Sequence, residues 1–279
     1  MPRSLEEGQY LLGDESRELA RLGEQHALWR DRVLEGWRLA GIAAGSRVVD
    51  VGAGPGWATE DLAAVVGPTG HVTAVERSDE FVAALRQRVA RSHANVSVHQ
   101  VDLMREHIPI EHGLHDAAWC RWVALFVPNI DLLVARIAAS LRVGGVAVFH
   151  EYANYRTYGT LPRRVEIEDF VTKAIQGLKQ CGGTVDAASP VMAALAKHHL
   201  ELVHVRALPV VARPSEPFWR WPSEFIRTFA PQLVALGLLD DTSHGRLIAA
   251  IDDAARDPSS VFIGPFNVEI VARLERPRP

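Results

Sequence analysis

The feature that most constrains the fold of this chain is the segment VVDVGAGPGWATEDLA, which runs from Val48 to Ala63. It begins with apolar residues that favour a β-strand, continues through Gly52, Gly54 and Gly56, and ends with residues that favour a helix. Glycine adopts backbone conformations that other residues avoid, and it lets the backbone come close to a ligand. A strand, a glycine turn and a helix in this order predict a ligand-binding βα unit.

Strands and helices alternate after this turn. Short apolar segments are separated by segments with helical periodicity. The expected strands are Arg47–Val51, His71–Glu76, Val96–Gln100, Asp116–Cys120 and Val146–Tyr152, and the expected helices are Trp57–Val66, Ser78–Ser92 and Asn129–Leu141. This alternation predicts an α/β fold with a parallel sheet, helices on both faces and all strands ending at one edge, where ligands bind.

The segments outside this alternation are predicted to be mostly helical. Residues 14–40 have helical periodicity, and residues 1–40 are expected to form an N-terminal helical cap. Residues 153–200 and 213–257 are expected to be helical insertions that form a lid over the strand edge, within one domain spanning residues 1–279. Two further strands are expected at Leu202–Val211 and Val261–Leu274.

Composition narrows the classes of function. The formal net charge is -4 and the sequence pI is about 6.3, which argues against a nucleic-acid binder with a broad basic surface. Cys120 and Cys181 are too far apart in the sequence to indicate a disulfide framework or a zinc site. Neither a signal peptide nor a membrane span is recognisable. We expect a cytoplasmic protein without nucleic-acid or membrane partners, with a homodimer as an option.

The three glycines resemble part of a dinucleotide-binding motif, but the complete pattern differs from that motif. The fingerprint GxGxxG requires a small sixth residue, and that position is Trp57. Asp50 also places a negative charge just before the turn, which suits a cationic ligand better than a pyrophosphate. A nicotinamide-dependent oxidoreductase is therefore the less favoured alternative.

A larger set of spaced residues resembles the class I S-adenosylmethionine-dependent methyltransferases, and most of all the bacterial members that act on small molecules. The set adds Glu76, at the end of the second strand, and Asp102, after the third, to Asp50 and the glycines. The resemblance covers about residues 40–152 and, less closely, the last strand. It implies a Rossmann-like seven-stranded sheet of order 3-2-1-4-5-7-6, with the last strand antiparallel, and the cofactor S-adenosyl-L-methionine.

The resemblance also implies where the methyl donor would bind. Glu76 would hold the ribose hydroxyls, since two carboxylate oxygens suit a vicinal diol, and Asp102 would lie near the adenine. The full set of candidate donor-binding residues is Asp50, Gly52, Ala53, Gly54, Gly56, Trp57, Glu76, Arg77, Asp102, Leu103, Cys120 and Arg121. Trp57 could face the sulfonium through cation–π attraction, with packing in the core as the alternative.

Candidate groups for the acceptor side follow the fifth strand. His150 could remove a proton from the acceptor and Glu151 could orient an amine or the base, with a strand-end residue bonded to backbone as the alternative for His150. The candidate substrate-binding residues are Tyr10, Trp122, Tyr152, Tyr155 and Tyr158, for which core packing is the alternative. His107, His112 and His115 are expected to lie in a solvated loop, so no metal site is predicted.

The predicted function is methyl transfer from S-adenosylmethionine to a small-molecule acceptor, with oxygen favoured over nitrogen or carbon. Such a displacement gains mainly from proximity and alignment, which can lower a barrier by roughly 7–11 kcal/mol. Three alternatives stay open: a non-catalytic protein that binds the donor, the nicotinamide-dependent oxidoreductase, and methylation of RNA or protein, which the low pI disfavours.

Overall fold

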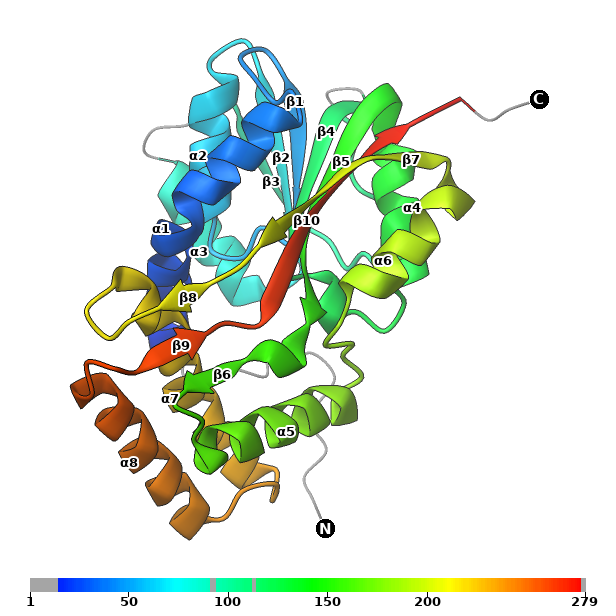
Figure 1. Ribbon diagram of the computed structural model, residues 1–279. Coiled ribbons are helices and arrows are strands. Elements are labelled where there is room, and N and C mark those ends of the chain that lie inside the picture. Colours follow the sequence, from blue (N-terminus) through cyan, green and yellow to red (C-terminus); the bar gives the residue numbers. More distant parts are fainter. Residues whose placement is uncertain (1–14, 91–93, 112–113, 277–279) are drawn as a thin grey trace. The chain divides into compact units, whose positions relative to one another are not determined.

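The computed structural model describes residues 15–90, 94–111 and 114–276, which form two compact units (Figure 1). The sheet unit comprises the described parts of 29–151, 187–207 and 268–279. The accessory unit comprises the described parts of 1–28, 152–186 and 208–267. This division does not follow the predicted insertion boundaries, because residues 187–207 group with the sheet and not with the other residues of 153–200.

The main sheet has the predicted topology. Its seven strands are β1 (Arg47–Val51), β2 (His71–Glu76), β3 (Val96–Gln100), β4 (His115–Arg121), β5 (Leu141–Asn154), β7 (Leu200–Leu208) and β10 (Phe266–Leu274). Their order is β3-β2-β1-β4-β5-β10-β7, with β10 antiparallel, which confirms the order expected from the sequence. The parallel register aligns Val51 with both Val75 and Cys120, so the carboxyl ends of β1, β2 and β4 share one edge.

Four of the predicted strands have different bounds in the structure: β4 and β7 differ by one to three residues at their ends, and β5 and the last strand differ most. β5 begins at Leu141 instead of Val146, because Leu141 already pairs with His115 of β4. The expected last strand is interrupted at Gly264 and Pro265, and becomes β9 (Val261–Ile263) and β10. The two pieces enter different sheets, so one continuous apolar pattern concealed a break.

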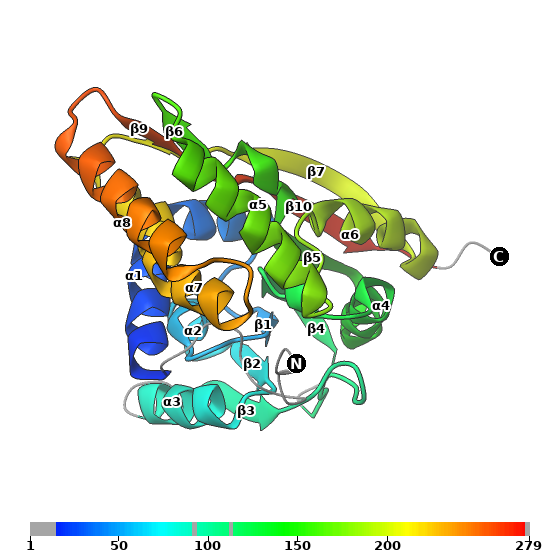
Figure 2. The same cartoon turned by 90° about the horizontal axis from the view of Figure 1, so that it is seen from below.

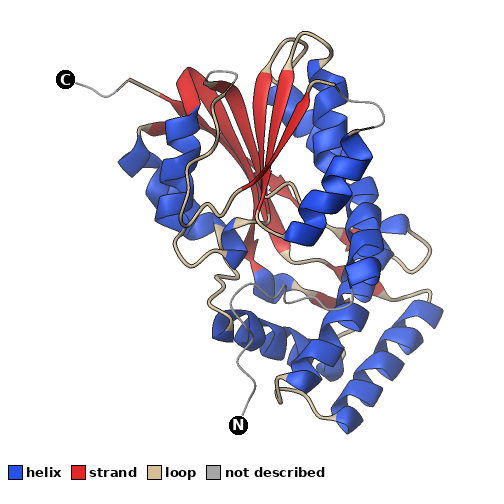
Figure 3. Cartoon of the chain, turned by 180° about the vertical axis from the view of Figure 1, so that it is seen from behind, coloured by secondary structure: helices blue, strands red, loops and turns tan. Residues whose placement is uncertain are grey.

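Helices cover both faces of the main sheet (Figure 3). α2 (Trp57–Val66) and α3 (Asp79–Val89) pack together on one face, and α4 (Ile130–Ser140) and α6 (Ala188–Leu195) on the other. The apolar residues of β1 and β4, and those of β5 from Val146 to Phe149, are almost completely buried, as expected for a parallel sheet covered on both sides. Ser78 and Asn129 cap α3 and α4 through side-chain oxygens that accept backbone N–H groups.

The accessory unit contains helices together with a small sheet. The sequence predicted helices in these segments but not the sheet. α5 (Val165–Gln180), α7 (Arg220–Ala235) and α8 (Asp241–Arg256) lie side by side (Figure 2). The sheet consists of β6 (Gly159–Leu161), β9 and β8 (Val211–Ala212), all antiparallel. Strands of two or three residues carry no periodic signal, which explains why this sheet was missed. In the part of the chain that the structure describes, no helix combines the length and apolar character of a membrane span.

A long helix, α1 (Glu15–Leu39), precedes the sheet, and its second half belongs to the sheet unit. A buried ionic cluster holds this half in place. The fully buried carboxylate of Glu269 accepts hydrogen bonds from His150 Nε2 at 2.7 Å and Arg206 Nε at 3.1 Å. Arg206 also pairs with Glu35 of α1. Gly36 lies against this cluster, since a Cβ atom there would be 1.8 Å from Glu269 Oε2.

Candidate functional site

The glycine turn connects β1 to α2 at the carboxyl edge of the sheet. Gly52, Gly54 and Gly56 have φ angles of 64°, 56° and 89°, in the left-handed region that favours glycine. Cβ atoms at Gly52 and Gly56 would lie 2.4 Å from Val123 Cγ2 and 2.2 Å from Leu85 Cδ1. A Cβ atom at Gly54 would meet nothing within 4 Å. The outer glycines therefore allow close packing, and the middle one borders open space.

Glu76, at the end of β2, is bound to this turn. Its Oε2 accepts a hydrogen bond from Gly54 N–H at 2.9 Å, and its Oε1 accepts from the N–H groups of Arg77 and Ser78 at 2.8 and 2.9 Å. The carboxylate is half-buried, and Oε2 retains a further lone pair, so it can also accept a hydrogen bond from a ligand. The Arg77 side chain is exposed, and only its backbone joins this arrangement.

Asp102 lies next to Glu76 because Val101 N–H donates to the Glu76 carbonyl at 2.9 Å. Asp102 Oδ1 accepts from Met104 N–H at 2.9 Å, and the carboxylate is partly exposed. Leu103 is buried behind it. The structure thus brings together the two acidic residues that the sequence proposed for the ribose and the adenine.

Asp50 lies beneath the turn rather than facing a ligand. It is 2% exposed and accepts a hydrogen bond from Thr59 Oγ1 of α2 at 2.6 Å. Burial raises the pKa of Asp50 to about 6, although the Thr59 hydrogen bond and the Arg121 charge oppose this shift. Asp50 therefore anchors α2 to β1, and its buried position does not support direct contact with a cationic ligand.

This burial leads to a testable pH dependence. Between about pH 4 and pH 6 the folded protein keeps a proton on Asp50 that the unfolded chain has lost, so the contribution of Asp50 to stability falls as the pH rises. We expect Asp50→Asn to be more stable than the wild type at pH 8, by about 2 kcal/mol, and this advantage to shrink toward pH 4. Urea unfolding at a series of pH values measures the difference.

Asp116 provides a control with the opposite sign. Burial alone would raise its pKa, but hydrogen bonds from Arg142 and from the Arg47 backbone lower it. Its carboxylate therefore stabilises the fold above its unfolded pKa, and that contribution is lost as the pH falls. Asp116→Asn should lose stability relative to the wild type as the pH rises. Parallel slopes for the two variants would contradict the assignment for Asp50.

Trp57 contacts a protein cation instead of presenting its ring to a ligand. The guanidinium of Arg88, from α3, lies 3.2 Å from the centroid of the Trp57 ring. Arg88 Nε also donates to the Pro55 carbonyl at 3.0 Å, which ties α3 to the glycine turn. The expected cation–π role toward a sulfonium is therefore not supported on this face of the ring, because Arg88 occupies it. No sequence signal pointed to Arg88, because its approach depends on how α3 packs.

The loop that leaves β4 lies beside the glycine turn. Cys120 is buried, which raises the pKa of its thiol well above the usual value, and Arg121 is half-buried. Trp122 has a positive φ of 53° and its N–H donates to the His150 carbonyl at 2.9 Å. Its ring is buried against Trp29, with ring centroids 5.3 Å apart. Trp122 is therefore a packed residue whose ring offers little surface to a substrate.

His150 is not placed as a general base. It has no exposed surface, its Nε2 is bonded to Glu269, and its ring packs 4.6 Å from that of Trp119. Burial lowers the pKa of His150, although the Glu269 carboxylate opposes the shift. A base must contact the proton that it removes, so the predicted role is corrected to a structural one. Glu151, the next residue, is also fully buried, and its Oε1 accepts from Val123 and Ala124 N–H at 3.2 and 3.0 Å.

The tyrosines expected to line an acceptor pocket belong to the accessory unit. Tyr155 and Tyr158 are each 3% exposed, and Tyr158 packs against Phe170 and Phe262. These two residues form the aromatic core of that unit, so their predicted substrate-binding role is corrected. Tyr152 is partly exposed and contacts Tyr155 edge to face. Tyr10 lies outside the described residues.

The histidine-rich segment also differs from the sequence prediction. His115 is buried at the start of β4, where its ring nitrogens contact the Ser140 carbonyl and Thr73 Oγ1, each at 3.1 Å. It is therefore part of the core and not of a solvated loop, while His107 is exposed. Among the described residues, no group of three or more His, Cys, Asp or Glu could hold a metal ion.

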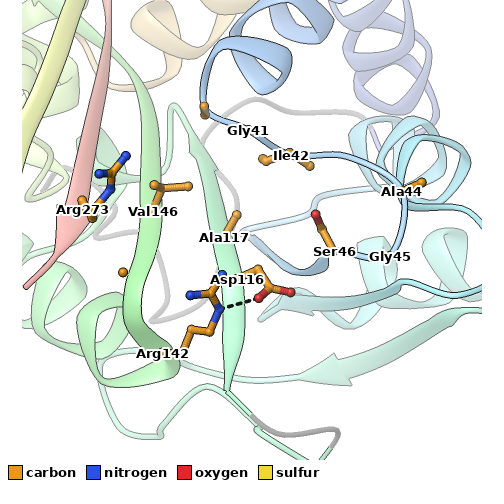
Figure 4. A pocket seen from close by; sticks show the side chains of 12 residues that line it. Gly41, Ile42, Ala44, Gly45, Ser46, Asp116, Ala117, Arg142, Val146 and Arg273 are labelled. Atoms are coloured by element: carbon orange, nitrogen blue, oxygen red, sulfur yellow. Dashed lines mark hydrogen bonds and ion pairs between the residues drawn. The ribbon is translucent and has the colours of Figure 1, made fainter.

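A polar hollow of about 390 Å³ lies at the opposite end of the sheet (Figure 4). It is bordered by Gly41, Ile42 and Arg273, and by Asp116, whose carboxylate pairs with Arg142 at 2.6 Å. Asp116 and Arg142 belong to the amino ends of β4 and β5, Gly41 and Ile42 to the loop before β1, and Arg273 to the carboxyl end of the antiparallel β10. Ligands of parallel sheets bind at the carboxyl ends, so the glycine turn and not this hollow is the candidate site.

The comparison with protein families agrees with placing the candidate site at the glycine turn. Residues 48–145 match the family model described as a methyltransferase domain. A demethylmenaquinone methyltransferase of Staphylococcus aureus (strain JH9) is 30% identical over 125 residues, which cover 45% of this chain and 49% of the relative. The chain thus spans about half the length of the curated relatives it matches.

Two solved structures share the fold at lower identity. A geranyl diphosphate C-methyltransferase from Streptomyces coelicolor A3(2), crystallised with Mg²⁺, geranyl diphosphate and S-adenosyl-L-homocysteine, has a TM-score of 0.55 at 18% identity. The alignment covers 95% of this chain and 89% of that one. The [4+2]-cyclase SpnF has a TM-score of 0.52 at 18% identity, covering 88% and 80%. One fold therefore serves more than one reaction among these neighbours.

Proposed function

We propose that this protein, which carries the methyltransferase domain of class I S-adenosylmethionine-dependent enzymes, transfers a methyl group from S-adenosylmethionine to a small molecule. The observation that carries the proposal is the left-handed glycine turn joined to the Glu76 carboxylate at the carboxyl edge of the sheet. The match of residues 48–145 to the methyltransferase domain supports it.

The residues present fit the donor. Gly54 borders open space, so a ligand can lie against the turn without meeting a side chain there. Glu76 and Asp102 are adjacent and partly exposed, so they would hold the adenosine through accepted hydrogen bonds. Leu103 and the exit loop of β4 would border the remaining parts of the donor. When bound, S-adenosylmethionine supplies an electrophilic methyl group, and the protein's task is to align it with the acceptor.

The acceptor is proposed to be a small molecule, as in the names of the S. aureus relative and the S. coelicolor enzyme. The atom that is methylated is a finer question. The sequence favoured oxygen, whereas the S. coelicolor enzyme is named a C-methyltransferase, so carbon is an equal candidate. With His150 and Glu151 fully buried, we propose no general base from β5.

The second candidate is a protein that binds the donor but performs another reaction or none. The [4+2]-cyclase favours keeping it, because that protein has the same fold and a different activity. A nicotinamide-dependent oxidoreductase is less favoured, since the glycine turn is followed by Trp57, which packs against Arg88.

Calorimetric titration with S-adenosylmethionine, S-adenosylhomocysteine and NADH tests the proposal. We expect micromolar dissociation constants for the first two, in the usual range for enzyme ligands, and no binding of NADH. Transfer of radiolabelled methyl to a panel of phenols, amines and activated carbon acids then separates the methyltransferase from the donor-binding alternative. Absence of binding to both adenosyl compounds would overturn the proposed function.

A further inference from the structure

We propose that Glu151 is a positioning residue that makes the donor pocket sensitive to charge, so that positively charged S-adenosylmethionine is favoured over its uncharged sulfide product. The inference rests on the proposed function and deepens it. It assigns discrimination between donor and product to a side chain that neither acts as a base nor belongs to the glycine turn.

Glu151 acts on the pocket through the exit loop of β4. Its Oε1 accepts hydrogen bonds from the N–H groups of Val123 and Ala124, at the start of a short 3₁₀ turn over Ala124–Phe126. Val123 in turn packs on Gly52, where a Cβ atom would lie 2.4 Å from Val123 Cγ2. The Glu151 carboxyl group therefore determines how closely the exit loop approaches the glycine turn.

The other carboxyl oxygen has no such partner. Glu151 has no exposed surface, and Oε2 makes no hydrogen bond within the described part of the chain. A buried carboxylate with an unpaired oxygen is unfavourable unless a positive charge lies nearby. This arrangement is suited to a binding site in which the bound ligand provides the positive charge.

The charged and titratable groups around Glu151 are mainly acidic, so they provide little positive charge to balance its carboxylate. β4 contributes Cys120 and Arg121, and the Arg121 charge acts on the buried Asp50 of β1. On β2, Glu76 adds a further negative charge near Asp50. His150 of β5 is bonded to Glu269 of β10, so its Nε2 faces that carboxylate. Arg121 thus acts on Asp50, and the shift of the Glu151 carboxyl group is caused by burial and its two backbone hydrogen bonds without a contribution from a cation.

The protonation state of Glu151 links this geometry to pH. Burial raises the pKa of Glu151 to about 8, although the two backbone hydrogen bonds oppose the shift, so the carboxyl group is mainly neutral at pH 7. A nearby cation lowers that pKa, and binding of the cation therefore releases a proton and strengthens as the pH rises toward 8. Donor and product share their ammonium and carboxylate groups, and they differ in the sulfonium charge.

Wild-type protein alone provides the first test. Calorimetry at pH 7.5 in two buffers of different ionisation enthalpy should show a fraction of a proton released with S-adenosylmethionine and less with S-adenosylhomocysteine. The ratio of the two dissociation constants, product over donor, should rise about tenfold between pH 7.0 and pH 8.5. Equal proton release with both ligands and a ratio independent of pH would overturn the inference.

Glu151→Gln tests whether this residue is responsible. Glutamine keeps the carbonyl oxygen that Val123 and Ala124 need but cannot ionise, so the ratio should become independent of pH. Asp131→Asn is the matched control, because Asp131 is an exposed carboxylate on α4 that pairs with Lys197 at 3.1 Å. It should retain the wild-type dependence. A pH-dependent ratio in Glu151→Gln would assign the effect elsewhere and contradict the inference.

These outcomes separate the two proposals. If neither adenosyl compound binds the wild-type protein, the proposed function fails and the role of Glu151 fails with it. If both bind, and the ratio does not depend on Glu151, the proposed function stands and the charge-sensing role is wrong.

Discussion

Replacing Glu76 with alanine is expected to weaken S-adenosylmethionine binding by roughly 10- to 150-fold, because a hydrogen bond to a charged group contributes about 1.5–3 kcal/mol and Oε2 has one free acceptor site for a ribose hydroxyl. The side chain also fixes the turn through Gly54 N–H at 2.9 Å. The fold should persist, since the three N–H groups that lose their acceptor belong to a half-buried segment that water can reach. Calorimetry measures the affinity and circular dichroism the fold.

Glu76→Gln is the matched variant for this experiment. It keeps one acceptor oxygen at the same reach, so its affinity should lie between those of the wild type and of Glu76→Ala. Unchanged donor affinity in Glu76→Ala, in a protein that is folded by circular dichroism, would show that the pocket is misassigned.

Replacing Gly36 with alanine is expected to destabilise the protein by about 3 kcal/mol, since the added methyl group would displace a fully buried ion pair. The new Cβ atom would lie 1.8 Å from Glu269 Oε2, whose partners are His150 and Arg206. Neither the helix nor the carboxylate has free space in which to yield, because Gly36 and Glu269 are both buried. The free energy of unfolding in urea measures the effect.

Gly245→Ala is the matched control for the same chemical change. Gly245 is exposed in the second turn of α8, and a Cβ atom there would meet nothing within 4 Å. Alanine should stabilise that helix by roughly 0.5–1 kcal/mol, because it loses less backbone entropy than glycine. If the two variants had equal stability, the close approach at Gly36 would not be a constraint on the fold.

Local sequence patterns were sufficient to predict the glycine turn and the strands of the main sheet. The strands Arg47–Val51, His71–Glu76 and Val96–Gln100 were predicted with the boundaries that the structure shows, because each is a short apolar run between turn residues. The order of the strands came from the resemblance and was confirmed. The small sheet of the accessory unit was missed, since β6, β8 and β9 are too short to show periodicity.

The amino-acid sequence by itself determined which residue types reach the carboxyl edge: three glycines after β1, an acid at the end of β2 and another after β3. These follow from chain order, because successive parallel strands end at the same edge. Only the tertiary structure decided which side chains remain available there. His150 looked like a base until Glu269, distant in sequence, was found bonded to it. Trp57 looked like a ligand contact until Arg88 was found over its ring. Burial and pairing depend on residues far apart along the chain, and a local pattern does not contain them.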